Sequence, residues 1–406
     1  MKDKQICVLG LGYIGLPTAA LLAAEGYNVV GVDINPDVIE TVNKGCIHIV
    51  EPDLDTYVSS AVTSGKLKAH LEPQPSDVYM ICVPTPFHES EGVPQPNIDY
   101  ILSATRRVAP LLKAGDVIIL ESTSPVGTTH KMADALRDEG VDIRSLSIAY
   151  CPERVLPGKV MIELVENDRI VGGVNPQATR VVADFYRTFV SGHVLETDAK
   201  TAEMCKLTEN SFRDVNIAFA NELSLLCDKN GINVWDLIRL ANHHPRVNIL
   251  QPGAGVGGHC IAVDPWFIVA RDPEEAIIIR SAREVNDHKT EWVIGKIADA
   301  AVQAGSRIGR RPRIACMGLA FKPDIDDLRE SPALEISEKL IAAGYDVVAV
   351  EPNITEHPRL SLTSLEAAAD DCDVLAFLVK HKSFLDPTVK ARLSGKIVLD
   401  FCGVEL

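Results

Sequence analysis

A thiol at the end of a glycine-rich run is the first candidate for chemistry in this sequence. Residues 251–265 read QPGAGVGGHCIAVDP, with four glycines in positions 253–258 and Cys260 shortly after them. Glycines would let backbone and substrate approach a reactive thiolate. Alternatively, Cys260 is a small buried apolar side chain, the usual fate of a reduced cysteine. The choice depends on which other groups the fold brings to Cys260.

Three polar residues interrupt a long apolar helix. Residues 197–232, TDAKTAEMCKLTENSFRDVNIAFANELSLLCDKNGI, predict this helix. Lys206, Asn210 and Arg213 are spaced by four and three residues, which places them on one face. That face is either a solvated stripe or the wall of an internal cleft. The apolar residues on both flanks favour the cleft.

The N-terminal segment predicts a dinucleotide-binding unit. The apolar run 5–9 reads as a buried strand, and Gly10, Gly12 and Gly15 follow it in G-x-G-x-x-G order and open a helix. These glycines permit a tight turn, close approach of a pyrophosphate and close packing of helix on strand. Asp33 ends the next strand, where a carboxylate accepts from the ribose hydroxyls and repels a 2′-phosphate. We therefore predict NAD binding, against the alternative of a glycine-rich turn that binds nothing.

The later strands of this unit end in polar turns. DVYMICVPTP, DVIILESTSPVG and SIAYCPERVLPG each begin with a buried strand. In doubly wound sheets the carboxyl ends of the strands line the ligand crevice. Thr85, Thr123 and Glu153 are therefore predicted to face the nicotinamide and the substrate. Each of them could instead be a simple turn or cap residue.

The C-terminal part repeats the pattern of the N-terminal unit. In both, a strand reaches a Gly-Leu pair, a helix ends at a Gly-Tyr pair, and an acid follows that glycine by seven residues. The acids are Asp33 and Glu351. In the second copy Ala320 replaces the middle glycine, and the turn carries Lys322 and Arg329, so a phosphate-bearing ligand other than a dinucleotide is expected. We predict an α/β fold with two Rossmann-like doubly wound domains joined by a central helical region.

Composition limits the possible partners. The chain has 406 residues, of which 46% are hydrophobic, and a formal net charge of −16. This charge argues against nucleic acid and anionic membranes as partners, and no apolar run approaches the roughly 18 residues that span a bilayer. Ten cysteines occur singly, which favours a reducing cytoplasm and no metal site. The N-terminus imitates a signal peptide, but its glycine spacing favours the nucleotide-binding turn.

Long segments resemble the UDP-glucose/GDP-mannose dehydrogenase family over essentially the whole chain. They are GLGYIGLPTAA, IHIVEPDL, VPTPF, ESTSPVGTT, AYCPERVLPG, TAEMCKLTENSFRDVNIAFANELSLLC, HPRVNILQPGAGVGGHCIAVDPWFIV and GLAFKPDIDDLRESPA. The resemblance is closest to the members that act on UDP-N-acetyl-D-mannosamine. It implies an NAD-binding domain at 1–197, a central dimerisation and catalytic region at 198–305, and a UDP-sugar-binding domain at 306–406. A homodimer or a higher homo-oligomer is expected.

The resemblance implies a four-electron oxidation of the sugar's carbon six, from primary alcohol to carboxylate, with two NAD reduced in succession. The intermediate aldehyde gives up no hydride until a nucleophile adds to its carbonyl. A thiolate forms a thiohemiacetal, which loses the second hydride to become a thioester that water then hydrolyses. Cys260 is the implied nucleophile, and the glycines before it are expected to let the loop close over the sugar.

The resemblance also assigns roles around this thiol. Lys206 and Asn210 would stabilise the oxyanion, Asp264 would orient Lys206 or the hydrolytic water, and Thr123 and Glu153 would lie near that water, with Glu153 as the base. Implied NAD contacts are Gly10, Gly12, Tyr13, Ile14, Gly15, Asp33, Thr85, Thr123 and Arg329. Implied substrate contacts are Arg154, Val155, Lys206, Asn210, Arg213, His244, Arg246 (from a neighbouring subunit), Gly257, Phe321 and Lys322. His259 is either structural or functional.

Two positions depart from the family pattern. Members that act on UDP-glucose carry a glutamate four residues after the position of Glu153, where this chain has Pro157. Relatives carry a basic, substrate-contacting residue where this chain has Cys402. The first departure favours the N-acetylmannosamine group, and the second puts one contact to the uridine diphosphate in doubt.

Three other functions stay open. The same reaction on UDP-N-acetylglucosamine differs only in the configuration at carbon two, which sequence patterns do not distinguish. A non-catalytic sensor of NAD or nucleotide sugars would not need Lys206, Asn210, Cys260 and Asp264 together. A two-electron hydroxyacid dehydrogenase would make one NADH per substrate and would not need Cys260.

Overall fold

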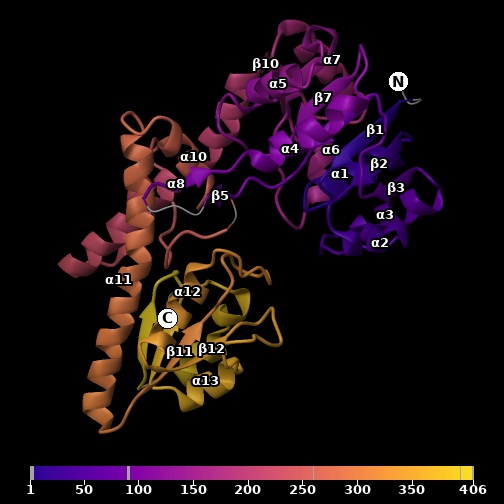
Figure 1. Ribbon diagram of the computed structural model, residues 1–406. Coiled ribbons are helices and arrows are strands. Elements are labelled where there is room, and N and C mark those ends of the chain that lie inside the picture. The colour runs from indigo at the N-terminus through magenta and orange to yellow at the C-terminus, as the bar shows by residue number, and fades with distance from the viewer. Residues whose placement is uncertain (1–3, 89–91, 259, 394, 405–406) are drawn as a thin grey trace. The chain divides into compact units, whose positions relative to one another are not determined.

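The computed structural model describes residues 4–88, 92–258, 260–393 and 395–404 (Figure 1). Contacts divide the chain into two compact units. The first is Met1–Thr208 with Trp266–Arg271, and the second is Glu209–Pro265 with Asp272–Leu406. Within the described ranges, no helix combines the length and apolar character that crossing a membrane requires.

The first unit is built on a mainly parallel sheet. In the described residues it has eight strands in the order β10-β9-β8-β7-β4-β1-β2-β3. They are β1 Gln5–Leu9, β2 Asn28–Val32, β3 Leu67–His70, β4 Val78–Ile81, β7 Val117–Leu120, β8 Ser147–Tyr150, β9 Arg169–Gly173 and β10 Val194–Asp198. The run from β3 to β8 has the strand order of a Rossmann fold, as the sequence predicts.

Two strands extend this sheet beyond the prediction. β9 pairs antiparallel with β8, and β10 pairs parallel with β9. Their sequences, RIVGG and VLETD, lack the continuous apolar run that marks the inner strands of a parallel sheet. A separate short ladder joins β5 Phe87–His88 to β6 Gln95–Pro96.

Helices cover both faces of the first sheet. Because successive strand residues point to opposite faces, Ile6 and Val8 of β1 belong to one core, and Cys7 and Leu9 to the other. The first core includes residues of α1 Gly15–Ala24, α2 Pro36–Asn43, α3 Leu54–Thr63, α6 Val160–Glu166 and α7 Pro176–Tyr186. The second includes residues of α4 Asp99–Val108 and α5 Thr128–Asp138. This is the predicted doubly wound arrangement.

The second unit holds a smaller Rossmann-like sheet. Its strands, within the described part of the chain, are β11 Arg313–Met317, β12 Asp346–Val350, β13 Val374–Phe377 and β14 Ile397–Asp400, all parallel in the order β12-β11-β13-β14. Helices α11 Ile277–Ile308 and α12 Pro332–Ala342 pack on one face, and α13 Leu365–Asp371 and α14 Pro387–Arg392 on the other. Since this order matches β2-β1-β4-β7, the predicted repeat is confirmed.

Central helices join these sheets in sequence. They are α8 Ala199–Asn230, α9 Val234–Ala241, α10 Asp264–Arg271 and the long α11, drawn in orange in Figure 1. α8 is the predicted long helix, and Gly231 follows its end with φ of 67°. In the second unit two buried hydrogen bonds tie α8 to α11: Arg283 Nη1 donates to Asp214 Oδ1 over 2.8 Å and Asn221 Nδ2 to Asn286 Oδ1 over 2.8 Å.

Candidate active site

The first glycine turn has the shape that a pyrophosphate requires. Gly10 has φ of 90°, and a Cβ there would lie 2.7 Å from the carbonyl oxygen of Cys82, while a Cβ on Gly15 would overlap the Gly10 carbonyl. A Cβ on Gly12 would meet nothing within 4 Å. The N-cap of α1, Ile14, makes no side-chain hydrogen bond. The middle glycine therefore leaves open space beside backbone N–H groups that suit an anion, which fits NAD.

Asp33 lies where the ribose acid is expected. Its Oδ2 accepts from the backbone N–H of Leu11 over 2.9 Å, and its Oδ1 accepts from that of Asn35 over 3.0 Å. These bonds orient a half-buried carboxylate beside the glycine turn. Tyr13 is exposed next to them.

Two predicted threonines meet at the carboxyl edge of the first sheet. Thr85 follows β4, Thr123 follows β7, and the Thr85 hydroxyl donates to the backbone carbonyl of Thr123 over 2.6 Å. Ser122 Oγ donates across the same gap to Val83 O over 2.6 Å. The structure therefore brings Thr85 and Thr123 together. The Thr85 hydroxyl has a structural role in this turn, in addition to its predicted contact with a ligand.

Glu153 is buried in an ion pair at the end of β8. Its Oε2 accepts from Arg169 Nη1 over 2.6 Å and its Oε1 from the N–H of Arg154 over 2.6 Å. Burial, reinforced by the charge of Glu153, raises the pKa of the neighbouring Glu121 carboxyl. A second acid, Glu51, accepts from the backbone N–H groups of Gly158 and Val160 over 2.9 and 2.8 Å. The turn with Arg154 and Val155 is thus held by Glu153 and by two buried or partly buried groups that the sequence did not single out, Arg169 and Glu51.

Another buried acid docks the start of α8 in the first unit. Glu203 is fully buried, and its carboxylate accepts from the N–H of Gly127 over 2.5 Å and from the N–H and hydroxyl of Thr129 over 2.8 and 2.6 Å. These contacts fix the helix against the turn that carries Thr123. Lys206, half-buried, lies about one helical turn further along.

The predicted thiol lies in the second unit with two of its expected partners. Cys260 is exposed, so its interpretation as a buried structural thiol is wrong. Its carbonyl accepts from the N–H of Asp264 over 2.8 Å. Asp264 is buried, and its Oδ2 accepts from Asn210 Nδ2 over 2.5 Å. Asn210 and Asp264 are thus bound to each other beside the Cys260 turn, whereas His259 lies outside the described residues.

The glycines before Cys260 are required by packing, and their predicted role in letting the loop close over a sugar stays a prediction. A Cβ on Gly255 would meet Pro332 at 2.9 Å, and one on Gly258 would meet the Phe321 ring at 2.9 Å. A Cβ on Gly257 would lie 3.0 Å from Phe321 Cβ and would overlap the carbonyl oxygen of Glu330. The loop therefore needs glycine because it lies directly against the turn that follows β11.

The turn after β11 carries three residues that are predicted to contact the substrate or NAD. Phe321 is half-buried and Lys322 is exposed. Arg329 forms a bidentate pair with Asp327, with Nη2–Oδ2 at 2.6 Å and Nε–Oδ1 at 2.9 Å. The remaining predicted substrate residues of this unit are exposed and lie on α8 or on the loop after α9: Arg213, His244 and Arg246.

The two departures from the family pattern lie in different units of the chain. Pro157 is exposed in the turn that Glu51 holds. Cys402 is half-buried after β14, and burial raises the pKa of its thiol well above the ordinary value. The Cys402 thiol is thus a poor nucleophile at neutral pH.

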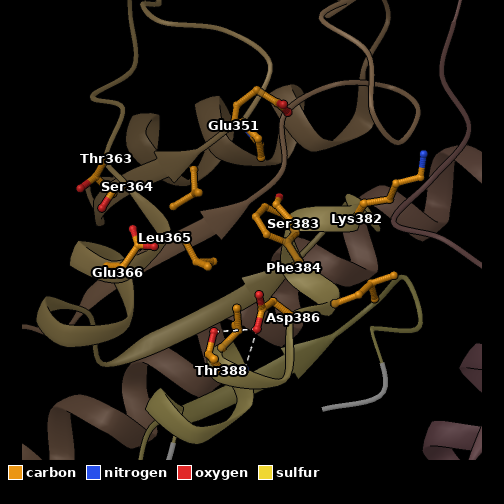
Figure 2. Close-up of a pocket in the computed structure, with 14 residues that line it drawn as sticks. Glu351, Thr363, Ser364, Leu365, Glu366, Lys382, Ser383, Phe384, Asp386 and Thr388 are labelled. Atoms are coloured by element: carbon orange, nitrogen blue, oxygen red, sulfur yellow. Dashed lines mark hydrogen bonds between the residues drawn. The ribbon is translucent and has the colours of Figure 1, made fainter.

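An open groove of about 590 Å³ lies beside the ends of β12 and β13. Figure 2 shows Glu351 at one edge of its lining, with Thr363 and Ser364 to one side and Lys382 to the other. None of the predicted site residues lines this groove. It is therefore a feature of the second sheet separate from the glycine loop and Cys260.

Known proteins match this chain from end to end. The UDP-glucose/GDP-mannose dehydrogenase family matches through its NAD binding domain over residues 4–190, its central domain over 200–288 and its UDP binding domain over 315–404. UDP-N-acetyl-D-mannosamine dehydrogenase of Escherichia coli (strain K12) is 54% identical over 403 residues, which cover 95% of both chains. NDP-N-acetyl-D-galactosaminuronic acid dehydrogenase of Ralstonia nicotianae is 52% identical over 417 residues, covering 99% of this chain and 96% of the relative.

A solved structure agrees with these matches. The UDP-D-ManNAc dehydrogenase from Pyrococcus horikoshii is 39% identical and superposes with a TM-score of 0.88, covering 99% of this chain and 96% of its own. The glycine turn open to a pyrophosphate lies within the range matched by the NAD binding domain, and Cys260 lies within the central domain. The chain therefore belongs to the UDP-glucose/GDP-mannose dehydrogenase family and is an NAD-dependent dehydrogenase.

Proposed function

We propose that this enzyme oxidises UDP-N-acetyl-D-mannosamine at carbon six to UDP-N-acetyl-D-mannosaminuronate. The observation that carries the proposal is the exposed Cys260 turn, whose carbonyl accepts from Asp264 while the Asp264 carboxylate accepts from Asn210. A hydroxyacid dehydrogenase or a nucleotide-sugar sensor has no use for a thiol there. The mannosamine sugar is favoured because relatives of that name are 54% identical.

Cys260 supplies the covalent step in this proposal. Its thiolate adds to the carbonyl carbon of the aldehyde and forms a C–S bond. The C=O π bond breaks, and the carbonyl oxygen becomes the alkoxide of a thiohemiacetal. Bound NAD would supply the oxidant for both oxidations, one equivalent for the hydride of the alcohol, which also loses a proton, and one for the hydride of the thiohemiacetal. Water then attacks the thioester, the C–S bond breaks, and the carboxylate and the Cys260 thiolate are released together with the two protons of the water.

Polar side chains assist each stage. The ammonium of Lys206 and the amide of Asn210 stabilise negative charge on the reacting oxygen. Asp264 holds Asn210 in orientation through the 2.5 Å hydrogen bond. Thr123 and Glu153 act on the hydrolytic side, where the Arg169 pair orients the Glu153 carboxylate and Glu153 is the proposed base.

The remaining proposed contacts to NAD and to the UDP-sugar come from three proposed parts of the chain. These are an NAD-binding domain at 1–197, a central region at 198–305 and a UDP-sugar-binding domain at 306–406. Asp33 binds the adenosine ribose, and the exposed cation Lys322 binds the diphosphate. The other proposed NAD contacts are Gly10, Gly12, Tyr13, Ile14, Gly15, Thr85 and Arg329. The other proposed sugar-nucleotide contacts are Arg154, Val155, Arg213, His244, Gly257 and Phe321, with Arg246 from a partner subunit.

We also propose a homodimer in a reducing cytoplasm. Phe212, Phe219 and Leu226 lie seven residues apart on α8 and are 68%, 52% and 51% exposed. A stripe of this spacing suits the packing of one helix on another. Phe219→Glu should yield monomers in light scattering, and an unchanged dimer mass would contradict the assignment of this stripe. All ten cysteines are thiols, which fits the compartment.

The yield of NADH tests the reaction. Purified enzyme should form about two NADH per UDP-N-acetyl-D-mannosamine consumed, with the uronate identified by mass. UDP-N-acetylglucosamine and UDP-N-acetylgalactosamine serve as matched substrates, since they differ from it only in configuration. A ratio near one with free aldehyde would exclude the thioester route, and preferential turnover of another epimer would replace the substrate assignment.

A further inference from the structure

A buried carboxylate anchors the turn that carries Phe321 and Lys322. Glu351 follows β12 and is 5% exposed, and its Oε2 accepts from the backbone N–H groups of Leu319 and Ala320 over 2.8 and 3.0 Å. Burial alone would raise the pKa of Glu351, but hydrogen bonds from His381 and from these backbone groups lower it to about 2. The anchor is therefore ionised at neutral pH.

An imidazole fixes the other end of the same segment. His381 follows β13 and is fully buried, with Nε2 3.0 Å from Glu351 Oε2. Its Nδ1 accepts from the backbone N–H of Asp324 over 3.0 Å. An accepting Nδ1 carries no proton, so Nε2 is the nitrogen that donates to the carboxylate. Glu351 and His381 thus hold Leu319 and Asp324, the two ends of a short segment.

A further contact reinforces this second attachment point. The backbone N–H of Lys382 donates to Asp324 Oδ1 over 2.9 Å. Asp324 has φ of 60°, a left-handed conformation that a residue other than glycine keeps only where its surroundings impose it. The hydrogen bond to His381 supplies part of that constraint.

The first unit shows how this arrangement differs from a nucleotide-binding acid. Asp33 also accepts from the N–H of the residue after the strand-end glycine, over 2.9 Å, but it is half-buried. Glu351 occupies the equivalent place, and its outer side is covered by His381 and by Asn353, whose Nδ2 donates to Oε1 over 2.9 Å. In the second unit the acid at this place is therefore an internal anchor.

The anchored segment touches the loop of the proposed nucleophile. Phe321 lies between Leu319 and Asp324, and Cβ atoms on Gly257 and Gly258 would lie 3.0 and 2.9 Å from its side chain. Cys260 follows Gly258 by two residues. A shift of this segment would displace Lys322 and remove the surface on which the glycine loop packs.

We propose that Glu351 and His381 are positioning residues that hold the segment Leu319–Asp324, so that Phe321 and Lys322 are placed for the UDP moiety of the substrate. The pair acts through the backbone of this segment and does not touch the substrate itself. This inference deepens the proposed function and rests on it.

Two substitutions of His381 separate its two hydrogen bonds. Asn places an amide near the position of Nδ1, so His381→Asn keeps a partner for Asp324 and loses Glu351. Gln reaches the position of Nε2, so His381→Gln keeps the donor to Glu351 and loses Asp324. In the full-length enzyme, each should weaken UDP binding by calorimetry and raise the KM of the UDP-sugar about tenfold, because a buried partner is left unsatisfied. The KM of NAD should stay within about twofold.

Controls distinguish positioning from general destabilisation. Ser337→Ala removes a buried hydroxyl that donates to Ala333 O over 2.8 Å on α12, and it should change Tm without changing either KM. Glu351→Gln keeps the side-chain shape and should raise the KM of the UDP-sugar more mildly; it decides the question where the His381 variants do not fold.

Two results would overturn the inference. One is unchanged UDP affinity in folded His381 or Glu351 variants, and the other is a parallel rise in the KM of NAD and of the sugar. Wild-type enzyme that binds UDP but oxidises no UDP-hexosamine would instead contradict the proposed function, and UDP binding would still test the positioning role.

Discussion

Asn210 Nδ2 lies 2.5 Å from Asp264 Oδ2, and the backbone N–H of Asp264 in turn donates to the carbonyl of Cys260 over 2.8 Å. Asn210 belongs to α8, whereas Asp264 is the first residue of α10 and Cys260 lies in the turn before it. One buried carboxylate therefore ties an amide on a long rigid helix to the turn that presents the proposed nucleophile.

Removing the amide of this pair should slow the chemistry. Asn210→Ala should lower kcat about a hundredfold, a typical loss for one oriented donor at a developing oxyanion, while the KM of NAD stays unchanged. Asn216→Ala is the matched control, because Asn216 lies on the same helix and donates to the backbone carbonyl of Phe212 over 2.7 Å. Equal losses in the two variants by steady-state kinetics would show that Asn210 acts only through the stability of α8.

Asp33 should decide the choice of cofactor. The wild-type enzyme should prefer NAD over NADP by about a hundredfold or more in kcat/KM, because the carboxylate repels a 2′-phosphate. Asp33→Ser should reduce that preference, whereas Asp37→Ser, an exposed acid in the first turn of α2, should not. Comparable efficiency of the wild-type enzyme with both cofactors would contradict this role.

Lys289 should make the free energy of unfolding depend on pH in the alkaline range. It is buried between α8 and α11, donates to Ser224 Oγ over 2.7 Å and lies 4.0 Å from the Trp292 ring centroid. Burial lowers its pKa to about 7, although Asp228 raises it and Lys296 lowers it further. In the unfolded chain the pKa of a lysine is about 10.4. Below about pH 7 the lysine is charged in both states, so the full cost of burying the charge lowers the free energy of unfolding.

This penalty is relieved as the pH rises from about 7 to 10.4, because the unfolded state then binds more protons. Lys289→Met should therefore stabilise the enzyme by about 1–3 kcal/mol at pH 7, and the gain should shrink toward pH 10. Urea unfolding of both proteins at several pH values measures it. A gain that is constant with pH would show that packing, and not the charge, sets the difference.

The sequence predicts the fold well wherever local spacing carries the signal. The strand–glycine–helix–acid order of 5–33 and its repeat at 313–351 both appear as parallel sheets with the same placement of Asp33 and Glu351. Local chemistry dictates these features, since glycine spacing and strand-end acids reflect contacts within one βαβ unit. The glycine run likewise singles out Cys260, whereas Asp264, four residues later, is assigned only through the resemblance to the family.

The groups that position these residues could not be predicted in this way. Glu203 binds Gly127, which is 76 residues away, and Glu51 binds Gly158, which is 107 residues away. A buried carboxylate that satisfies distant backbone N–H groups leaves no local periodicity, and its only sequence signal is an acid within an otherwise apolar segment. For the same reason, the glycines at 255, 257 and 258 could not be attributed to packing before their neighbours Phe321, Glu330 and Pro332 were placed.

The substitution Cys260→Ser tests the covalent mechanism most directly. Binding of NAD and UDP should survive, because the glycine turn near Asp33 and the segment with Lys322 are unchanged, and slow formation of aldehyde should persist. Acid production should fall by several orders of magnitude, as expected for loss of a catalytic nucleophile. Cys402→Ser is the matched control. Because the Cys402 thiol has a raised pKa, this variant should keep nearly full turnover.

The decisive measurement is steady-state acid production by the two variants, together with intact-protein mass spectrometry of quenched wild-type enzyme. We expect a covalent adduct on the wild-type enzyme, no adduct on Cys260→Ser, and acid production only where Cys260 is present. Near-normal acid production by Cys260→Ser would contradict the thioester mechanism and leave Cys260 as an exposed residue of a glycine-rich loop.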